Sequence, residues 1–225
     1  MKTSPTSSSS SPLDLLNDPS LLKTDALING KWVKGEARFD INDPATGLKL
    51  ATVSNLSASD ATKAIGVAAA ALKTWRLKTG KERHAILLKW FQLIMANQDD
   101  IARILTSEQG KPHMQAGSEI AGCVGMTRAL PMLNLEEKIT EDSDKRLSRT
   151  RRVPVGVVGG IVPWNFPVLM AIQKIVPALL SGCTMVLKPS PFTPLATLRL
   201  AELIAGVFPK GVLNIITGGD EIGRA

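Results

Sequence analysis

Three short apolar runs alternate with two segments of helical spacing between residues 153 and 219. The runs are VPVGVVGGIVP, TMVLKP and GVLNIITGG. The first is rich in valine and isoleucine, which is typical of a strand that is buried on both faces. The order β-α-β-α-β predicts parallel strands joined by right-handed crossovers. We therefore expect an α/β fold built on a Rossmann-like parallel sheet.

Both intervening segments carry helix boundary signals. The first has an apolar stripe that ends at Gly182 and consists of Leu169, Ile172, Val176 and Leu179. In the second, Thr193 is a candidate N-cap and Pro194 would take the first helical position. These signals predict two crossover helices between the three strands.

The sequence before residue 153 predicts short β elements followed by a helical region. Asn29-Gly30 is a type I′ turn signal that predicts a hairpin over residues 26–35, and Asp43-Pro44 marks a further turn. Helices are expected near residues 57–75, 82–97, 99–109 and 114–130. The buried face of the first is expected to hold Ala64, Ile65, Ala68, Ala69 and Leu72. Residues 145–156 are expected to be extended.

The net charge of +7 raises the question of a nucleic-acid partner. The 27 Lys and Arg residues are scattered and Tyr is absent, so aromatic side chains do not interleave with the basic ones. The densest basic stretch, residues 145–152, follows acidic residues at 141, 142 and 144, which is typical of a solvated edge. No apolar run reaches the ~18 residues of a membrane span. We expect neither a nucleic-acid nor a membrane partner.

Cysteine and histidine usage gives no sign of a metal site. Cys123, Cys183, His84 and His113 have no ligand spacing, and two such thiols fit a reducing compartment. We therefore expect a cytoplasmic protein. The Ser-rich start lacks the apolar core of a secretory signal, and we expect residues 1–20 to be a disordered tail, with organelle targeting as the alternative.

The carboxyl ends of the three predicted strands carry PWN at 163–165, KPS at 188–190 and TGG at 217–219. Ligands of open parallel sheets bind beyond these ends. VVGGIVPWNFP, SGCTMVLKPSPFTP and GVLNIITGGDEIG resemble the cofactor-binding half of the NAD(P)-dependent aldehyde dehydrogenase superfamily. TSEQGKP at 106–112 resembles another segment of that family. The similarity runs from about Ala26 to Ala225.

The resemblance implies a fold and a reaction. The fold would be an incomplete Rossmann-like sheet of the aldehyde dehydrogenase type over residues 21–225, with 145–155 as an extended bridging segment and the catalytic domain absent. In this family a cysteine thiolate attacks an aldehyde, and the oxyanion then expels a hydride onto the nicotinamide. Asn165 matches the amide that stabilises this oxyanion. A turn-forming asparagine that bonds its own backbone is the alternative.

The resemblance also implies a cofactor site. Its expected members are Ile161, Val162, Pro163, Trp164, Lys188, Ser190, Pro191, Gly219 and Gly223. Lys188 would bond the ribose hydroxyls, with a solvated loop lysine as the alternative. Gly219 and Gly223 would let a helix beginning near Asp220 approach the pyrophosphate. Family members that prefer NAD often carry a glutamate where this chain has Pro191, so the implied cofactor is NAD or NADP. Lys174 matches a common family lysine, and a salt-bridged helix lysine is equally compatible with its position.

The nucleophilic cysteine, the general-base glutamate and the oligomerising strand of the family lie in segments without a counterpart in this sequence. Cys183 and Cys123 are expected to be buried packing residues. Three interpretations remain: an enzyme of the aldehyde-oxidising class, an NAD(P)-binding fragment or partner subunit, and a truncated gene product without a function of its own. We expect no turnover by the chain alone, since nucleophile and base act as a unit.

Overall fold

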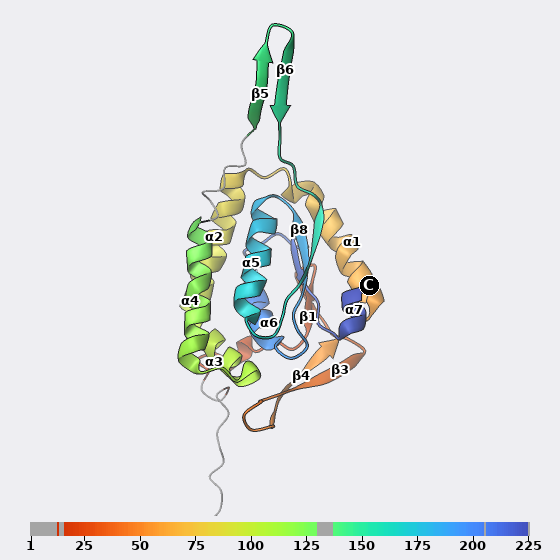
Figure 1. Ribbon diagram of the computed structural model, residues 1–225. Helices are drawn as coiled ribbons and strands as arrows, with labels where there is room; N and C mark the ends of the chain where they lie inside the picture. The colour runs from red at the N-terminus through yellow and green to blue at the C-terminus, as the bar shows by residue number, and fades with distance from the viewer. Residues whose placement is uncertain (1–12, 14–15, 130–136, 205, 225) are drawn as a thin grey trace, which may run out of the picture.

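The computed structural model describes residues 13, 16–129, 137–204 and 206–224, and its centre is a sheet in the order β2-β1-β9-β8-β7 (Figure 1). The bounds are β1 Ala26–Ile28, β2 Lys31–Val33, β7 Val157–Ile161, β8 Thr184–Lys188 and β9 Leu213–Ile215. β7, β8 and β9 are parallel, with Val157 opposite Thr184 and Val186 opposite Asn214. The predicted parallel β-α-β-α-β unit is confirmed.

The predicted N-terminal hairpin is also confirmed, and it extends the central sheet. Asn29 and Gly30 adopt φ of 54° and 68°, as a type I′ turn requires. β1 then pairs antiparallel with β9 through Leu27 and Ile215. The sequence analysis did not predict this pairing, because nothing local to either strand specifies a partner almost 200 residues away.

Helices cover both faces of the sheet (Figure 1). α5 (Pro167–Leu180) and α6 (Leu195–Glu202) pack on one face, and α1 (Ala58–Trp75) packs on the other, next to the short α7 (Asp220–Arg224). An outer layer of α2 (Gly80–Ala96), α3 (Gln98–Gln109) and α4 (His113–Ala129) packs against α5 and α6. The remaining described elements are a 3₁₀ turn, Pro19–Leu21, and the strands β3 Ala37–Asn42, β4 Lys49–Asn55, β5 Lys138–Ser143 and β6 Arg146–Thr150.

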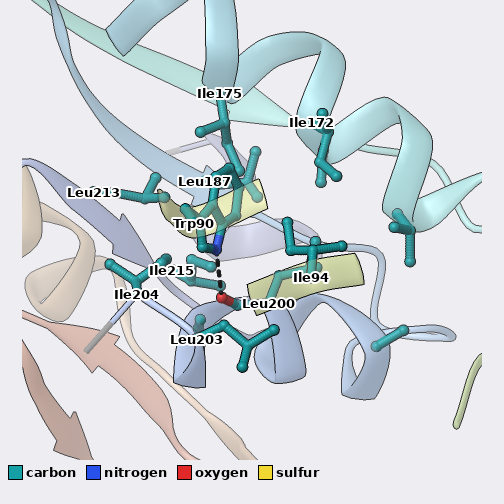
Figure 2. Close-up of a cluster of buried hydrophobic side chains, with 14 of the residues drawn as sticks. Trp90, Ile94, Ile172, Ile175, Leu187, Leu200, Leu203, Ile204, Leu213 and Ile215 are labelled. Atoms are coloured by element: carbon teal, nitrogen blue, oxygen red, sulfur yellow. Dashed lines mark hydrogen bonds between the residues drawn. The ribbon is translucent and has the colours of Figure 1, made fainter. Parts of the chain in front are cut away.

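Trp90 joins the outer layer to the sheet layer (Figure 2). Its side chain is fully buried, among apolar residues that include Ile175 and Ile215. Its indole Nε1 donates a hydrogen bond to the carbonyl oxygen of Leu200 in α6 at 3.2 Å. The apolar contacts of this ring and the hydrogen bond of its indole N–H therefore hold α2 against α6.

Five expectations about the fold need correction. β7 is not buried on both faces, because Gly160 is its only buried residue and Ile161 is 59% exposed. On α1, Ile65 and Ala69 are exposed, while Ala64 and Ala68 are buried as predicted. Residues 146–150 are extended as β6, but they pair with the unpredicted β5 in a hairpin that projects from the body of the molecule.

The fourth correction concerns the N-terminal tail. Residues 1–12, 14 and 15 of the predicted disordered segment lie outside the described residues. Leu16 is already buried, and the backbone N–H and side-chain amide of Asn17 both donate to Asp100 Oδ1 at 2.9 Å. The packed part of the chain thus begins before residue 20.

The start of α6 is capped from a distance rather than by Thr193. Glu108 of α3 accepts hydrogen bonds from Leu195 N at 2.7 Å and Ala196 N at 2.8 Å. Thr193 makes no side-chain cap, and its buried Oγ1 has no hydrogen-bond partner among the described residues. The prediction of Thr193 as N-cap is therefore wrong, because a buried carboxylate already satisfies the orphan N–H groups.

Replacing Trp90 by alanine is expected to lower the free energy of unfolding by about 3–5 kcal/mol, since it removes a fully buried ring and leaves a cavity. L88A on the same helix is the control, because Leu88 is 41% exposed. Its cost should stay below about 1 kcal/mol. Urea denaturation of the two variants checks this, and equal costs would contradict the central role of Trp90.

Burial raises the pKa of Glu108 from 4.5 to about 8, against the opposing effect of its two N–H donors. The folded chain then retains a proton that the unfolded chain loses above pH 4.5. Stability should therefore fall as the pH rises from about 4.5 to about 8, by at most about 1.4 kcal/mol per pH unit. E108Q keeps an acceptor oxygen and cannot ionise, so its denaturation midpoints should vary less over that range. An unchanged pH slope would refute this prediction.

Candidate cofactor-binding site

A cavity of about 300 Å³ lies between the sheet and α1, and α7 contributes two residues to its lining. Its lining is almost entirely apolar and consists of Ala61, Ile65, Val157, Gly159, Gly160, Ile161, Val186, Lys188, Ile216, Ile222 and Gly223. The side chains of β8 alternate between the two faces of the sheet, so Val186 and Lys188 face α1 while Met185 and Leu187 face α5. The strand alternation therefore places one ammonium group at an apolar wall.

Lys188 is the charged residue of this lining. It is only 6% exposed, and its one hydrogen bond among the described residues is a long contact of 3.4 Å to the carbonyl oxygen of Pro189. Burial lowers its pKa, while the charge of Asp220 acts in the opposite direction. A buried ammonium group with so few hydrogen bonds is energetically unfavourable, and a ligand with acceptor oxygens would supply the missing ones.

Three glycines, Gly159, Gly160 and Gly223, also line the cavity. A Cβ on Gly159 would meet no atom within 4 Å, so this residue leaves open space on the cavity side of β7. A Cβ on Gly160 would instead lie 2.2 Å from Met185 Cε on the α5 face. A Cβ on Gly223 would approach Lys188 Cδ at 3.5 Å and Ile161 Cδ1 at 3.6 Å. The absence of side chains at Gly159 and Gly223 keeps the cavity open, whereas the absence of one at Gly160 makes room for Met185.

The structure brings together three of the predicted cofactor residues, Ile161, Lys188 and Gly223. Two others have structural partners: Ser190 Oγ accepts a hydrogen bond from Phe192 N at 3.3 Å, and Gly219 N donates to Asn55 Oδ1 at 3.3 Å. Val162 is buried, Pro163 and Trp164 are exposed, and Pro191 is half-buried, and none of these lines the cavity. Lys174 lies near Gly160 on the α5 face, away from the cavity, and forms no ion pair among the described residues.

Asn165 lies in the turn between β7 and α5. The residue is exposed, and its side-chain amide makes no hydrogen bond within the part of the chain that the structure describes. Its backbone carbonyl oxygen accepts a hydrogen bond from Lys111 Nζ at 2.9 Å. The side chain of Asn165 thus has no local backbone partner of the kind that a turn-forming asparagine uses, and it is open to a ligand.

Both cysteines are packing residues, as the sequence predicts. Cys123 is fully buried, its Sγ donates to the carbonyl oxygen of Glu119 at 3.2 Å, and burial raises the pKa of its thiol to about 12. Cys183 is 3% exposed. Both side chains belong to the main apolar core.

Sequence reasoning missed the contributions of α1 and of Gly159. Ala61 and Ile65 line the cavity, and the exposure of Ile65 that contradicts a packed helix face is explained by this position. The glycine pair in VVGGIVP was the available signal, since glycine in a strand often marks a close approach of a ligand or backbone.

No helix among the described residues is both long and apolar enough to span a membrane.

Comparison with known proteins identifies relatives of this geometry. The sequence pattern of the Aldehyde dehydrogenase family matches residues 32–225. The chain is 42% identical over 213 residues to the 3-sulfolactaldehyde dehydrogenase of Pseudomonas putida. It is 45% identical over 214 residues to the NADP(+) succinate-semialdehyde dehydrogenase of Escherichia coli. Each match covers 90% of this chain and 43% of the relative, so the chain spans less than half the length of these proteins.

Solved structures agree with this likeness. The crystal structure of an NADP-dependent enzyme of E. coli superposes with a TM-score of 0.86 at 42% identity, over 91% of this chain and 44% of that one. A betaine aldehyde dehydrogenase variant from Staphylococcus aureus, in complex with NAD+, superposes with a TM-score of 0.85 at 34% identity. That match covers 90% of this chain and 43% of that one.

Valine substitutions at the two adjacent glycines of β7 are expected to destabilise the protein to different extents. G160V should lower the free energy of unfolding by about 1–3 kcal/mol, because its side chain would overlap Met185 and Leu187. G159V should cost less than about 1 kcal/mol, since its side chain enters open space and valine favours a strand. Thermal unfolding of both proteins checks this contrast, and similar losses would refute the assignment of the two faces.

Proposed function

The chain belongs to the aldehyde dehydrogenase family, and on this premise we propose that the cavity beside Lys188 binds the adenosine part of NAD+ or NADP+. The observation that carries the proposal is the buried and poorly satisfied ammonium group at the wall of an apolar cavity. Ribose hydroxyls would complete the hydrogen bonds of Lys188. The apolar lining from α1 and β7 suits a flat heteroaromatic ring.

We assign either coenzyme because Pro191 cannot repel a 2′-phosphate. A glutamate carboxylate near the adenosine ribose would accept hydrogen bonds from both hydroxyls and would disfavour a second negative charge. Pro191 has neither effect. The named cofactors of the relatives include both forms, since one is an NADP(+) enzyme and another structure is a complex with NAD+.

The reaction that we propose for the complete site is the oxidation of an aldehyde to a carboxylic acid. A bound nicotinamide would supply the acceptor for the hydride. Asn165 would donate its side-chain amide to the oxygen that gains negative charge, an effect typically worth ~3 to 4 kcal/mol. The exposed and unbonded amide in the turn after β7 supports this role. Ile161 is the last residue of β7 and Asn165 lies in the turn that follows, so three residues of chain separate the cavity wall from the residue that carries the amide.

The thiol nucleophile and the general base of this reaction come, in our proposal, from outside these 225 residues. Cys123 and Cys183 are the only cysteines of the sequence, and both are buried. In this proposal the described residues supply a cofactor site and an oxyanion donor, and the thiolate that forms the covalent intermediate comes from elsewhere. We place the protein in the cytoplasm, and we expect no aldehyde oxidation by the 225 residues alone.

A second candidate function is that of a partner subunit that binds a polypeptide carrying the thiol and the base. The free edge of β7 and the exposed rings of Trp164 and Phe166, at 54% and 47%, support it. The transcript beyond codon 225 separates the two cases. An open frame that continues to a cysteine segment and a glutamate segment favours one complete enzyme, whereas a stop codon favours a partner subunit or a product without function.

Coenzyme binding tests the proposal directly. NAD+ or NADP+ at millimolar concentration should raise the melting temperature of the chain, since a ligand that binds only the folded state stabilises it. K188M should weaken this binding by about tenfold or more, because a charged hydrogen bond contributes roughly 1.5–3 kcal/mol. K73M, which removes an exposed lysine of α1, is the control. No shift with either coenzyme would refute the cavity assignment.

A further inference from the structure

A buried ion pair joins the outer helical layer to the turn that carries Asn165. Lys111, in the loop between α3 and α4, hydrogen-bonds Glu119 of α4 through its Nζ. The two side chains are 9% and 0% exposed. Glu119 also accepts hydrogen bonds through Oε1 from the backbone N–H groups of Val168 and Leu169, at 2.9 and 3.0 Å. The carboxylate thereby caps the first turn of α5, where Phe166 gives no side-chain cap.

Lys111 makes two further contacts on the same turn. Its Nζ donates to the carbonyl oxygen of Asn165 at 2.9 Å and lies 4.5 Å from the centre of the Phe166 ring. An ammonium group has three donors and is attracted to the face of an aromatic ring. Lys111 therefore contacts Asn165 and Phe166 directly. Through Glu119 it is also linked to Val168 and Leu169 in the first turn of α5.

The loop before Lys111 fixes the direction of this side chain. Gly110 adopts φ of +85° and ends α3, and a Cβ at this position would lie 2.9 Å from Pro44 Cγ. The Lys111 backbone N–H donates to Gln109 Oε1 at 3.0 Å. A left-handed residue next to a packed proline requires glycine. The TSEQGKP segment consequently aims a lysine from the end of α3 at the turn after β7.

We propose that Lys111 is a positioning residue for Asn165, acting with Glu119 to set the direction of the Asn165 side-chain amide. The backbone of Asn165 is held by its carbonyl oxygen, and the helix that follows is held at its N-terminus. The side chain can then project toward a ligand without a local bond of its own. The functional meaning of this inference rests on the proposed oxyanion role of Asn165, but the geometry does not depend on it.

The test uses the full chain and follows the two side-chain N–H resonances of Asn165 by NMR, assigned from their loss in N165D. K111M alone leaves the buried Glu119 without a counter-charge and could unfold the protein. The main variant is therefore K111M/E119Q, because the amide oxygen introduced by E119Q can still accept from Val168 N and Leu169 N. R103M is the matched control, since it removes an ion pair of α3 that does not contact this turn.

We expect the Asn165 side-chain resonances to move by more than their line width in K111M/E119Q and to stay in place in R103M. The backbone amide resonances of Val168 and Leu169 should remain protected from exchange in both proteins, which shows that the cap is intact. Asn165 resonances that coincide with those of the wild type in a folded K111M/E119Q would overturn the proposal. If the ion pair were purely stabilising, its loss would lower the melting temperature and leave these resonances unchanged.

A second measurement on the unmodified chain gives a result even if the double variant does not fold. The Lys111 Hε protons should be shifted upfield by the Phe166 ring, and F166L should return them to ordinary values. Phe166 is 47% exposed, so this substitution should not disturb the fold. Lys111 protons without an upfield shift would overturn the proposal. Neither measurement needs coenzyme, so a failure of the cofactor assignment and a failure of this inference are separate results.

Discussion

Two buried glutamate side chains from the outer helices accept hydrogen bonds from the first N–H groups of both crossover helices. Glu108 accepts from the first N–H groups of α6, and Glu119 accepts from those of α5. A helix N-terminus has orphan N–H donors, so a side chain with acceptor oxygens placed there satisfies them. The turns after β7 and β8 immediately precede these helices. The geometry at the carboxyl edge of the sheet therefore depends on side chains that come from the outer helical layer.

The two faces of the sheet then have different tasks. On the α5 face, Met185, Leu187 and the ring of Trp90 belong to one continuous apolar core. On the α1 face, a smaller cluster leaves room for a cavity, and Lys188 is its charged lining residue. Gly159 and Gly160 are adjacent in β7, yet they serve opposite faces because strand residues alternate. One strand therefore supplies both a packing contact and a cavity wall.

Local signals predicted the elements of this fold, and long-range contacts decided the rest. The Asn29-Gly30 turn and the stripe around Trp90 were readable because a turn type and a helical period are encoded in neighbouring residues. The cap of α6 was not readable, since Thr193 fits the local rule and Glu108 acts across 87 residues of sequence. For the same reason, Lys188 and Gly223 were identified through a resemblance, whereas the lining residues Ala61 and Ile65 of α1 were missed.

A buried ammonium group at a cavity wall and a nucleophilic thiol have opposite physical requirements. In the proposed cofactor site, ribose hydroxyls would replace the water that the buried Lys188 loses. A nucleophilic thiol instead needs an environment that stabilises the thiolate, and burial of Cys123 next to the carbonyl of Glu119 does the reverse by raising its pKa to about 12. In the reaction that we propose, an ionisable thiol must therefore reach the exposed amide of Asn165 from outside the core that contains Cys123 and Cys183.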